Sequence, residues 1–402
     1  MAAVFILRKK WAINGASCLP SGSRLTLLTI PMAYSPIDPK TLVRRAGEWL
    51  RTEGPDADVV VSCRVRLARN LAGEPFVARM NPERAILIAS RLKEVLLEAR
   101  IDGDTSWVSM LEASPVVRLL LCERNLISRD LMPEEAAGSD SGADASGRAV
   151  AFGESESNSV MVNEEDHVRL QAMAAGMDLD LALQRARILD RFMEERVAFA
   201  HTPSLGYLTG CPTNVGTGMR ASVMLHLPGL GLVRGELEKV FNAAQRTSLV
   251  VRGMAGEGSR AAGDFYQISN QITLGRSESQ LIGDLMALLP KIIEFERRIR
   301  SELNEHLGVP LRDRIHKSQA VLRSARSIPT ADALAHLSNL RLGLHLGMVD
   351  GPGVRDLNEL GLQVQRGHVQ ALVAADPEEG LLDVSERDQA RAAILRARLA
   401  MP

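Results

Sequence analysis

Short runs of apolar residues, several alternating with polar residues at a period of two, mark the first three quarters of the chain. A period of two places successive side chains on opposite faces of a β-strand, so these runs predict strands. The predicted strands span residues 59–67, 116–122, 159–162, 168–173, 219–227, 248–252, 266–269 and 272–274. Several lie too close together for the helical crossovers of a parallel sheet, which favours a mainly antiparallel sheet.

Apolar residues spaced three and four apart predict helices between and after these strands. The predicted helices span residues 39–50, 82–100, 178–200, 280–306, 312–326, 330–346 and 385–399, with one further strand around Val364. Beyond residue 280 the pattern is almost wholly helical. We therefore expect an α+β fold, with an antiparallel sheet flanked by helices over residues 32–300 and an all-helical C-terminal domain over residues 301–402.

Two segments do not fit a packed core. Residues 133–148 contain no large apolar side chain, and they predict a flexible insertion that we place over residues 133–158. Residues 1–31 lack the arrangement of a secretory signal, because their short apolar run does not closely follow the basic residues. They predict a disordered leader or a start assigned too early, with Met32 as the alternative first residue.

The composition excludes several classes of protein. The 402 residues carry a formal net charge of −1, which gives no general attraction to nucleic acid or to anionic membranes. No apolar run approaches the roughly 20 residues that span a bilayer. The four cysteines, Cys18, Cys63, Cys122 and Cys211, include no Cys-x-x-Cys pair. We therefore expect neither a zinc site nor a disulfide scaffold, and a reducing, cytoplasmic location.

Five arginines lie in the predicted strands or at their ends: Arg64, Arg66, Arg169, Arg220 and Arg252. Arg64 and Arg66 are two residues apart on one strand, so they point to the same face. Like charges on a sheet repel one another and are costly to desolvate, and a polyanion such as a triphosphate would neutralise them. The alternative is that each arginine pairs with a carboxylate or lies on a solvated face.

The segment from Cys211 to Arg220, Cys-Pro-Thr-Asn-Val-Gly-Thr-Gly-Met-Arg, brings a glycine-rich loop next to one of these arginines. Glycine removes the Cβ obstruction, so backbone amides can approach a phosphate closely. No Gly-Lys-Ser/Thr follows, so this is not a Walker A loop. A Gly-Thr-Gly on its own is more often a turn than a phosphate site.

Glu164, Glu165 and Asp166 form an acidic cluster at a predicted turn, and Glu257 follows Arg252 by five residues. To attack phosphorus, a guanidinium must lose a proton, although its pKa exceeds about 12. Carboxylates can bind that cation, orient one nitrogen and accept its proton. The pattern favours a site with a basic end for ATP and an acidic end for a guanidine, against the alternative of a solvated turn or helix cap.

Four segments resemble, in order, the motifs of the phosphagen kinases, the ATP:guanido phosphotransferases. These segments span residues 62–70, 162–169, 211–222 and 252–257. Four ordered motifs over about 200 residues are a specific match, and the resemblance covers roughly residues 58–300. It implies a phosphagen-kinase-like catalytic domain that uses ATP with Mg²⁺, the metal being held mainly by the phosphates and not by protein ligands.

The resemblance also implies roles for individual residues. Glu165 would be the main base, Glu257 would clamp the guanidinium with Glu164 nearby, and Cys211 would orient it as a low-pKa thiol, unless it is an inert buried cysteine. Asn125 stands where the family usually has His. The implied ATP-binding residues are Cys63, Arg64, Val65, Arg66, Leu67, Asn125, Arg169, Arg220, Ala221, Ser222, Val223, Met224, Arg252, Gly253, Met254, Ala255, Gly256 and Glu257.

The helical C-terminal domain gives the chain the layout of the bacterial protein-arginine kinases of the McsB type, which it resembles. That family carries an Arg-Asp-x-x-Arg-Ala motif that binds phosphoarginine as a regulatory ligand. Here the motif comprises Arg387, Asp388, Arg391 and Ala392. Arg387 and Arg391 are four residues apart and would share a helical face. Without the resemblance, this hexamer would be a solvated helix face.

The resemblance implies direct in-line phosphorylation of exposed arginines in proteins, which marks them for a Clp-type protease and relieves stress-gene repression. An activator protein, a stress repressor and a Clp ATPase are the implied partners, and a homodimer is expected. Two alternatives stay open. One is a kinase for free arginine or another small guanidine, and the other is a weakly active adaptor that binds phosphoarginine.

Overall fold

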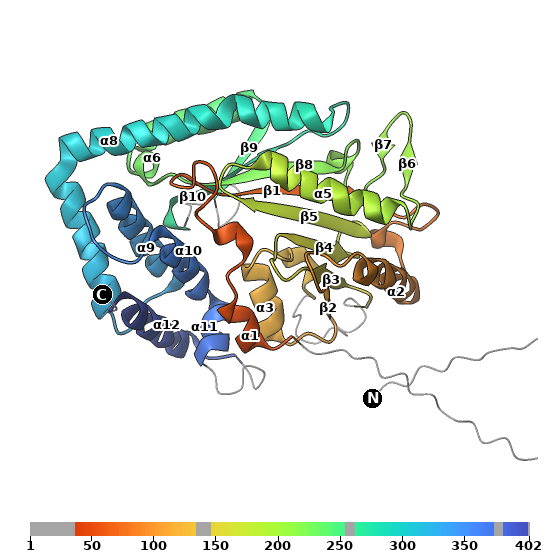
Figure 1. The fold of residues 1–402 in the computed structure, drawn as a ribbon, viewed down its shortest axis with the longest axis horizontal. Helices are drawn as coiled ribbons and strands as arrows, with labels where there is room; N and C mark the ends of the chain where they lie inside the picture. Colours follow the sequence, from red (N-terminus) through yellow and green to blue (C-terminus); the bar gives the residue numbers. More distant parts are fainter. Residues whose placement is uncertain (1–36, 134–145, 254–261, 374–380, 401–402) are drawn as a thin grey trace, which may run out of the picture. The chain divides into compact units, whose positions relative to one another are not determined.

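An eight-stranded antiparallel sheet forms the centre of the protein, in the strand order β2-β3-β4-β5-β1-β8-β10-β9 (Figure 1). The structure is a computed structural model that describes residues 37–133, 146–253, 262–373 and 381–400. The strands of this sheet are β1 (Val60–Arg69), β2 (Ser106–Ser109), β3 (Ala149–Phe152), β4 (Asn158–Val162), β5 (Val168–Ala175), β8 (Met219–His226), β9 (Leu249–Gly253) and β10 (Phe265–Asn270). The predicted leader, residues 1–31, lies outside the described residues.

Helices cover both faces of this sheet, and a two-stranded hairpin of β6 (His201–Thr202) and β7 (Gly206–Tyr207) stands beside it. The helices are α1 (Pro39–Arg44), α2 (Pro82–Glu98), α3 (Pro115–Glu123), α5 (Leu179–Glu194), α6 (Pro228–Leu232), α7 (Arg234–Arg246), α8 (Glu278–Ser324), α9 (Thr330–His345), α10 (Val354–Gln363), α11 (Arg366–Val373) and α12 (Val384–Leu399). The prediction of an α+β fold with a mainly antiparallel sheet and a helical C-terminal part is confirmed.

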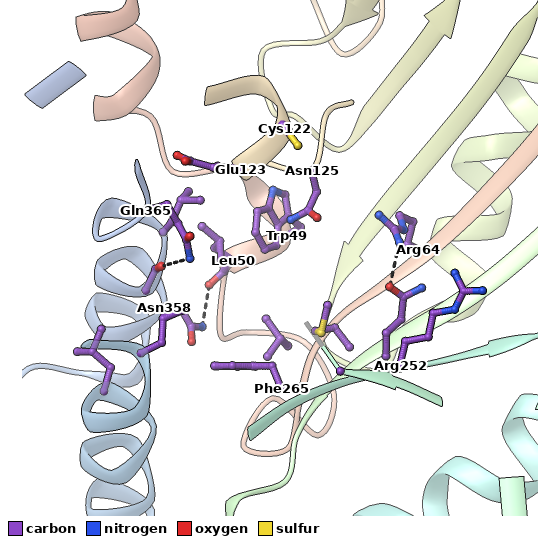
Figure 2. Close-up of a pocket in the computed structure, with 18 of the residues that line it drawn as sticks. Trp49, Leu50, Arg64, Cys122, Glu123, Asn125, Arg252, Phe265, Asn358 and Gln365 are labelled. Carbon is purple, nitrogen blue, oxygen red and sulfur yellow. Dashed lines mark hydrogen bonds between the residues drawn. The ribbon is translucent and has the colours of Figure 1, made fainter. Parts of the chain in front are cut away.

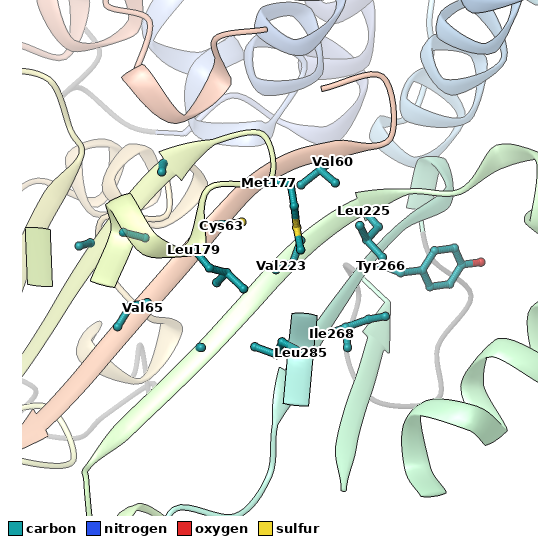
Figure 3. Close-up of a cluster of buried hydrophobic side chains, with 14 of the residues drawn as sticks. Val60, Cys63, Val65, Met177, Leu179, Val223, Leu225, Tyr266, Ile268 and Leu285 are labelled. Carbon is teal, nitrogen blue, oxygen red and sulfur yellow. The ribbon is translucent and has the colours of Figure 1, made fainter. Parts of the chain in front are cut away.

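The main hydrophobic core lies between the sheet and helices α5 and α8. Alternate residues of the central strand, Cys63, Val65 and Leu67, are fully buried on this side. Figure 3 shows the neighbouring strand and helix α8 contributing Val223 and Leu285 to the same cluster. Full burial of one such aliphatic side chain stabilises a fold by roughly 1.5–3 kcal/mol. This face therefore supplies the stability on which the opposite, polar face depends.

The strand predicted over residues 116–122 is wrong, because this segment is helix α3. Ser114 caps the helix by accepting a hydrogen bond from the Val117 amide (3.4 Å), and Pro115 occupies its first turn. Nearly all of its residues are apolar because the helix is packed between other elements. A short, uniformly apolar run cannot be assigned to strand or helix by periodicity alone.

Two further predicted strands are also wrong. Residues 272–274 have no strand geometry, and Thr273 instead donates its hydroxyl to the backbone oxygens of Thr213 (2.8 Å) and Val215 (2.7 Å). Val364 is the C-cap of helix α10. In both cases one or two apolar residues imitated a strand although the chain turns there.

The flexible insertion was placed over too long a range. Residues 149–152 form strand β3, which lies between β2 and β4 in the sheet. All four of its residues are buried. Residues 134–145 lie outside the described part. Strand β3 is so short, and follows so polar a segment, that its own pattern gave no separate signal.

The helices predicted over residues 280–306 and 312–326 form one continuous element, α8. Its single non-helical residue is Leu307 (φ −122°, ψ 27°), three residues before Pro310. A proline inside a helix removes a hydrogen bond and clashes with the preceding turn, so the predicted interruption has a physical cause. Helix α8 runs through residue 300, where we placed the domain boundary, and that boundary stays a prediction.

A buried ion pair joins the end of α3 to the loop between β3 and β4. The guanidinium of Arg124 and the carboxylate of Glu156 are both almost completely buried, with Nη2 2.6 Å from Oε1. Arg124 also donates to the backbone oxygen of Arg45 (2.8 Å). Burial raises the pKa of Glu156, although the charge of Arg124 acts in the opposite direction.

We expect Arg124→Met to lower the free energy of unfolding by about 3–5 kcal/mol, because it leaves the Glu156 carboxylate buried without its cation. Urea denaturation measures the effect. The matched control is Arg298→Met, which removes an exposed pair with Glu302 and should cost less than about 1 kcal/mol. Equal losses in the two variants would contradict a structural role for the buried pair.

Candidate active site

The five arginines identified in the sequence lie on one face of the sheet. Arg64 and Arg66 alternate with core residues on β1, and the strand register pairs Arg66 directly with Arg220 on β8. The registers of β5 and β9 turn Arg169 and Arg252 to the same face. Side chains of directly paired residues lie on the same side of an antiparallel sheet, so the pleat gathers these cations. The sequence predicted a common face for Arg64 and Arg66, and the strand registers add the other three arginines to it.

Two of these arginines, Arg64 and Arg220, have neutral hydrogen-bond partners on this face of the sheet. Arg64 donates to the side-chain oxygen of Gln267 (3.2 Å), and Arg220 lies 3.3 Å from the Ser269 hydroxyl. Burial, together with the charges of Arg169 and Arg220, lowers the pKa of Arg64 to about 10. The Gln267 contact orients the Arg64 guanidinium without neutralising its charge.

Arg66 is repelled by the positive charges of three neighbouring arginines. Its Nε is buried without a hydrogen-bond partner, and the described part of the chain provides no ion pair for it. Burial lowers its pKa well below the usual value, and the charges of Arg64, Arg169 and Arg220 lower it further. An anion bound on this face would relieve both penalties, because a guanidinium fork matches phosphate oxygens.

Five of the residues assigned to ATP binding by resemblance have their side chains on the opposite face. These are Cys63, Val65, Leu67, Ala221 and Val223, all fully buried in the hydrophobic core (Figure 3). The period of two in a strand requires this, since each of them lies next to a residue of the arginine face. They support the site through the backbone. Burial also raises the pKa of the Cys63 thiol.

A cavity of about 530 Å³ opens on the arginine face, within the range of small-ligand sites. Figure 2 shows Arg64 and Arg252 on one side of it, with Trp49, Leu50 and Asn125 facing them. Met224 and Gly253, two other residues assigned by resemblance, also line the cavity, whereas Ser222 is buried on the arginine face beside Arg64.

Asn125 has a positive φ of 59°, and it follows Arg124, the C-cap of helix α3. Asparagine tolerates this left-handed conformation better than most residues. Its backbone oxygen accepts a hydrogen bond from the Gln171 side chain, which lies on the arginine face of β5. The predicted place of Asn125 at the nucleotide site is therefore consistent with the geometry, although its contact with a nucleotide stays a prediction.

The acidic cluster lies at the turn between β4 and β5, and its three members have different surroundings. Glu164 is buried in an ion pair with Arg169 (Nη1–Oε2 2.5 Å), and Ser128 donates to it as well. Burial alone would raise the pKa of Glu164, but Arg169 and these hydrogen bonds lower it overall. Glu164 therefore orients an arginine, whereas the side chain of Glu165 is exposed and available to a substrate.

Asp166 has a role that sequence reasoning did not identify. Its buried carboxylate accepts hydrogen bonds from Asn70 (2.6 Å) and from the Gly210 amide (2.5 Å). Burial raises its pKa. A Cβ on Gly210 would lie 2.8 Å from the Glu165 backbone oxygen, so only glycine fits there. This contact holds Cys211, the next residue, beside the turn that carries Glu165.

The glycine-rich loop continues from Cys211, whose Sγ lies 3.0 Å from the Thr213 hydroxyl. The φ angle of Gly216 (114°) is one that other residues rarely adopt, and that of Gly218 (64°) favours glycine. A Cβ on Gly218 would also lie 2.6 Å from the backbone oxygen of Ala68. The loop therefore packs tightly against the end of β1, beside the arginine face.

Four residues assigned by resemblance, Met254, Ala255, Gly256 and Glu257, lie outside the described residues. Within the described residues, no cluster of three or more His, Cys, Asp or Glu side chains could hold a metal ion. No described helix is both long enough and apolar enough to cross a membrane.

The C-terminal motif differs from the expected phosphate grip. Arg391 is almost completely buried, and it donates to the backbone oxygens of Val364 (2.7 Å) and Ile328 (2.8 Å) as well as to Asp388. The guanidinium thereby fixes α12 to the end of α10. The buried Ala392 follows it. Helical spacing did not reveal these backbone acceptors from other elements, and the binding of phosphoarginine by the motif stays a prediction.

Arg387 remains partly exposed on α12. It donates to the backbone oxygen of Leu382. Partial burial lowers its pKa, and the neighbouring charges of Arg366 and Arg391 act in the same direction.

Two family models match consecutive parts of the chain. The ATP:guanido phosphotransferase C-terminal catalytic domain matches residues 88–299, and the protein-arginine kinase McsB C-terminal domain matches residues 309–402. The protein-arginine kinases of Bacillus cereus (strain ATCC 10987 / NRS 248) and Bacillus mycoides (strain KBAB4) are each 40% identical to it over 353 residues. Each match covers 87% of this chain and 95% of the relative.

Solved structures support the fold. The duplicated taurocyamine kinase from Schistosoma mansoni, with bound transition-state-analogue components, is 26% identical with a TM-score of 0.52, over 62% of this chain and 35% of that one. A lombricine kinase is 22% identical with a TM-score of 0.52, over 64% of this chain and 72% of that one. The phosphagen-kinase-like sheet predicted from the sequence is thus confirmed.

We expect Arg66→Met to remove anion binding without destabilising the anion-free protein, because one of several mutually repelling cations is lost. In wild type, inorganic tripolyphosphate at about 100 times its Kd should raise the free energy of unfolding by about 2.7 kcal/mol. Most of this gain should disappear in the variant, as measured by thermal or urea unfolding.

The matched control for this experiment is Arg187→Met, on α5, where an exposed arginine pairs with Glu278. It should keep the full stabilisation by tripolyphosphate. The interpretation of Arg66 would be wrong if Arg66→Met destabilised the anion-free protein and left the effect of tripolyphosphate unchanged.

Proposed function

This chain belongs to the protein-arginine kinase family, and we propose that it transfers the γ-phosphoryl group of ATP to arginine side chains of proteins. The observation that carries the proposal is the arginine face of the sheet, with Arg66 lacking any ion pair in the described residues. Beside that face lie an exposed carboxylate, Glu165, and a partly exposed thiol, Cys211. The arginine face would be the ATP end of a guanidine kinase site, and Glu165 with Cys211 would be its guanidine end.

The arginine face would bind the triphosphate. Arg64, Arg66, Arg220 and Arg252 supply fixed positive charge where negative charge is redistributed during transfer, and such preorganised groups need little rearrangement in the transition state. Mg²⁺ would be held mainly by the phosphates. Bound there, it neutralises phosphate charge.

The acidic turn would bind the substrate guanidinium. Glu165 takes a proton from one guanidinium nitrogen while that nitrogen forms a bond to the γ-phosphorus, and the bond between this phosphorus and the leaving oxygen of ADP breaks. The products are ADP, phosphoarginine and a protonated Glu165, which then releases its proton to water. Cys211 and, from the sequence motif, Glu257 orient the guanidinium.

The acceptor of the phosphoryl group would be a protein and not a free guanidine. The names of the relatives and of the matched C-terminal model support this. Phosphorylated proteins would be delivered to a Clp-type protease, and a phosphorylated stress repressor would release its genes. The protein would act in the cytoplasm as a homodimer, together with an activator protein and a Clp ATPase. The C-terminal motif around Arg387 and Asp388 would bind phosphoarginine as a regulatory ligand.

We expect label from γ-labelled ATP to appear on an arginine-rich protein in an acid-labile form. Mass spectrometry under conditions that preserve P–N bonds would place it on arginine. A parallel incubation with free arginine tests the alternative acceptor. Transfer to free arginine alone would contradict the protein-kinase assignment, and absence of transfer with retained phosphoarginine binding would support the adaptor alternative.

Glu165→Gln should reduce kcat by roughly 10²–10⁴-fold, because the amide cannot accept the guanidinium proton. The KM for ATP should change little, since the arginine face is intact. Glu238→Gln, an exposed position on α7, serves as the control and should retain full activity. Undiminished transfer by Glu165→Gln would show that another group is the base.

A further inference from the structure

One wall of the cavity belongs to the helical C-terminal part of the chain and not to the sheet. Helix α9 contributes Leu334 and Leu337, and α10 contributes Leu357 and Leu362. All four leucines are buried. Figure 2 shows α10, with Asn358 and Gln365, across the cavity from Arg64 and Arg252. The cavity therefore has a basic wall from one part of the chain and four leucines, beside polar residues such as Arg341, from the other. We call these four leucines the apolar wall.

The two ends of the central strand differ in chemistry. Towards its C-terminal end, Ala68 pairs with Arg169, which contacts the acidic turn. Towards its N-terminal end, Val61 lines the cavity together with Met224 and Phe265. The seven residue steps from Val61 to Ala68 span roughly 23 Å. An elongated ligand can thus reach from the acidic turn to the apolar wall.

The arginines lie between these ends in an order that fixes the direction of a bound nucleotide. Arg66 and Arg220 are the pair nearer the acidic turn, and Arg64 lies one pleat further towards the cavity, which Arg252 also lines. A phosphate chain whose γ end meets the substrate guanidinium must follow these arginines away from the turn. Its other end, which carries the sugar and base, then arrives at the leucines of α9 and α10.

Hydrogen bonds fix the apolar wall against the sheet part of the chain. Arg341 of α9 donates to the backbone oxygen of Ala57 (3.0 Å) and to the side chain of Asn358 (2.6 Å). Asn358 in turn donates to the backbone oxygen of Leu50 (3.2 Å), a bond drawn in Figure 2. Both side chains line the cavity, so these hydrogen bonds form part of its wall.

A second tie lies directly beside Asn125. The Glu123 carboxylate accepts hydrogen bonds from the first free amides of α11, those of Gly367 (2.7 Å) and His368 (3.0 Å), and from the His368 ring (2.7 Å). A Cβ on Gly367 would lie 2.8 Å from the Cβ of Leu119, so α11 can approach α3 this closely only with glycine. The wall is thus a preformed surface.

We propose that the base of the bound nucleotide lies between Met224 and Phe265 of the sheet and the leucines of α9 and α10, so that both parts of the chain form the ATP site. This proposal rests on the proposed function. A flat, largely apolar base gains free energy by leaving water for such a surface, and the charged triphosphate does not. The C-terminal helices are therefore a determinant of nucleotide affinity, through contacts made only by the base and sugar.

Hydrogen–deuterium exchange on the full chain separates the two ends of the ligand. With Mg²⁺ present, ATP should slow exchange in strands β1 and β8 and in helices α9 and α10. Inorganic tripolyphosphate should slow exchange only in the strands. Protection of the strands alone by ATP would overturn the proposal, as would equal protection of α9 and α10 by tripolyphosphate. Failure of both ligands to protect the strands would instead contradict the proposed ATP site itself.

A substitution tests the same wall. Leu337→Trp places extra volume at the apolar end, and the KM for ATP should rise on the order of tenfold, equivalent to about 1.4 kcal/mol, while the Kd for tripolyphosphate stays unchanged. Leu372→Trp, at a partly exposed position on α11 outside the cavity, is the matched control and should leave both values unchanged. Equal losses of ATP and tripolyphosphate binding in Leu337→Trp would assign its effect to general damage and overturn the proposal.

Discussion

Repulsion among guanidinium groups on one face of the sheet is the constraint on which the rest of the structure depends. The pleat and register of β1, β5 and β8 bring Arg64, Arg66, Arg169 and Arg220 together. Arg169 is paired with Glu164, whereas Arg66 has no ion pair within the described residues. Such a face is unfavourable without an anion. It is held by the hydrophobic core on the other side of the same strands, where alternate residues are fully buried. The alternation of residues along these strands thus forms the stabilising core on one face and the unfavourable cluster of arginines on the other.

The acidic turn at the other end of the site also combines structural and exposed groups. Glu164 neutralises Arg169, Asp166 fastens the acidic turn to Gly210, and Glu165 is left exposed between them. Three consecutive acids therefore have three different roles, which are set by their partners and not by their residue types. The exposed position of Glu165 suits a group that must accept a proton from an incoming substrate.

Much of the fold could be predicted from the sequence, because strands such as β1 and β8 alternate clearly and helices such as α2 and α5 have long apolar faces. Helix α3 could not, since packing on several sides removes the periodicity that distinguishes helix from strand. Among site residues, the arginines were found because charges within strands are unusual. The roles of Asp166 and Arg391 depend on backbone acceptors and donors far away in sequence, which no local pattern records.

The buried guanidinium of Arg391 has a thermodynamic consequence. It binds the backbone oxygen of Val364, and the next residue, Gln365, lines the cavity. Any ligand that changes how α12 holds the end of α10 therefore acts on the surface that we assign to the nucleotide base. Coupling free energy between two sites is reciprocal, so a ligand of α12 that strengthens ATP binding must itself be bound more tightly by the ATP-loaded protein. Through the side chain of Arg391, the occupancy of a site on α12 would change with the occupancy of the ATP site.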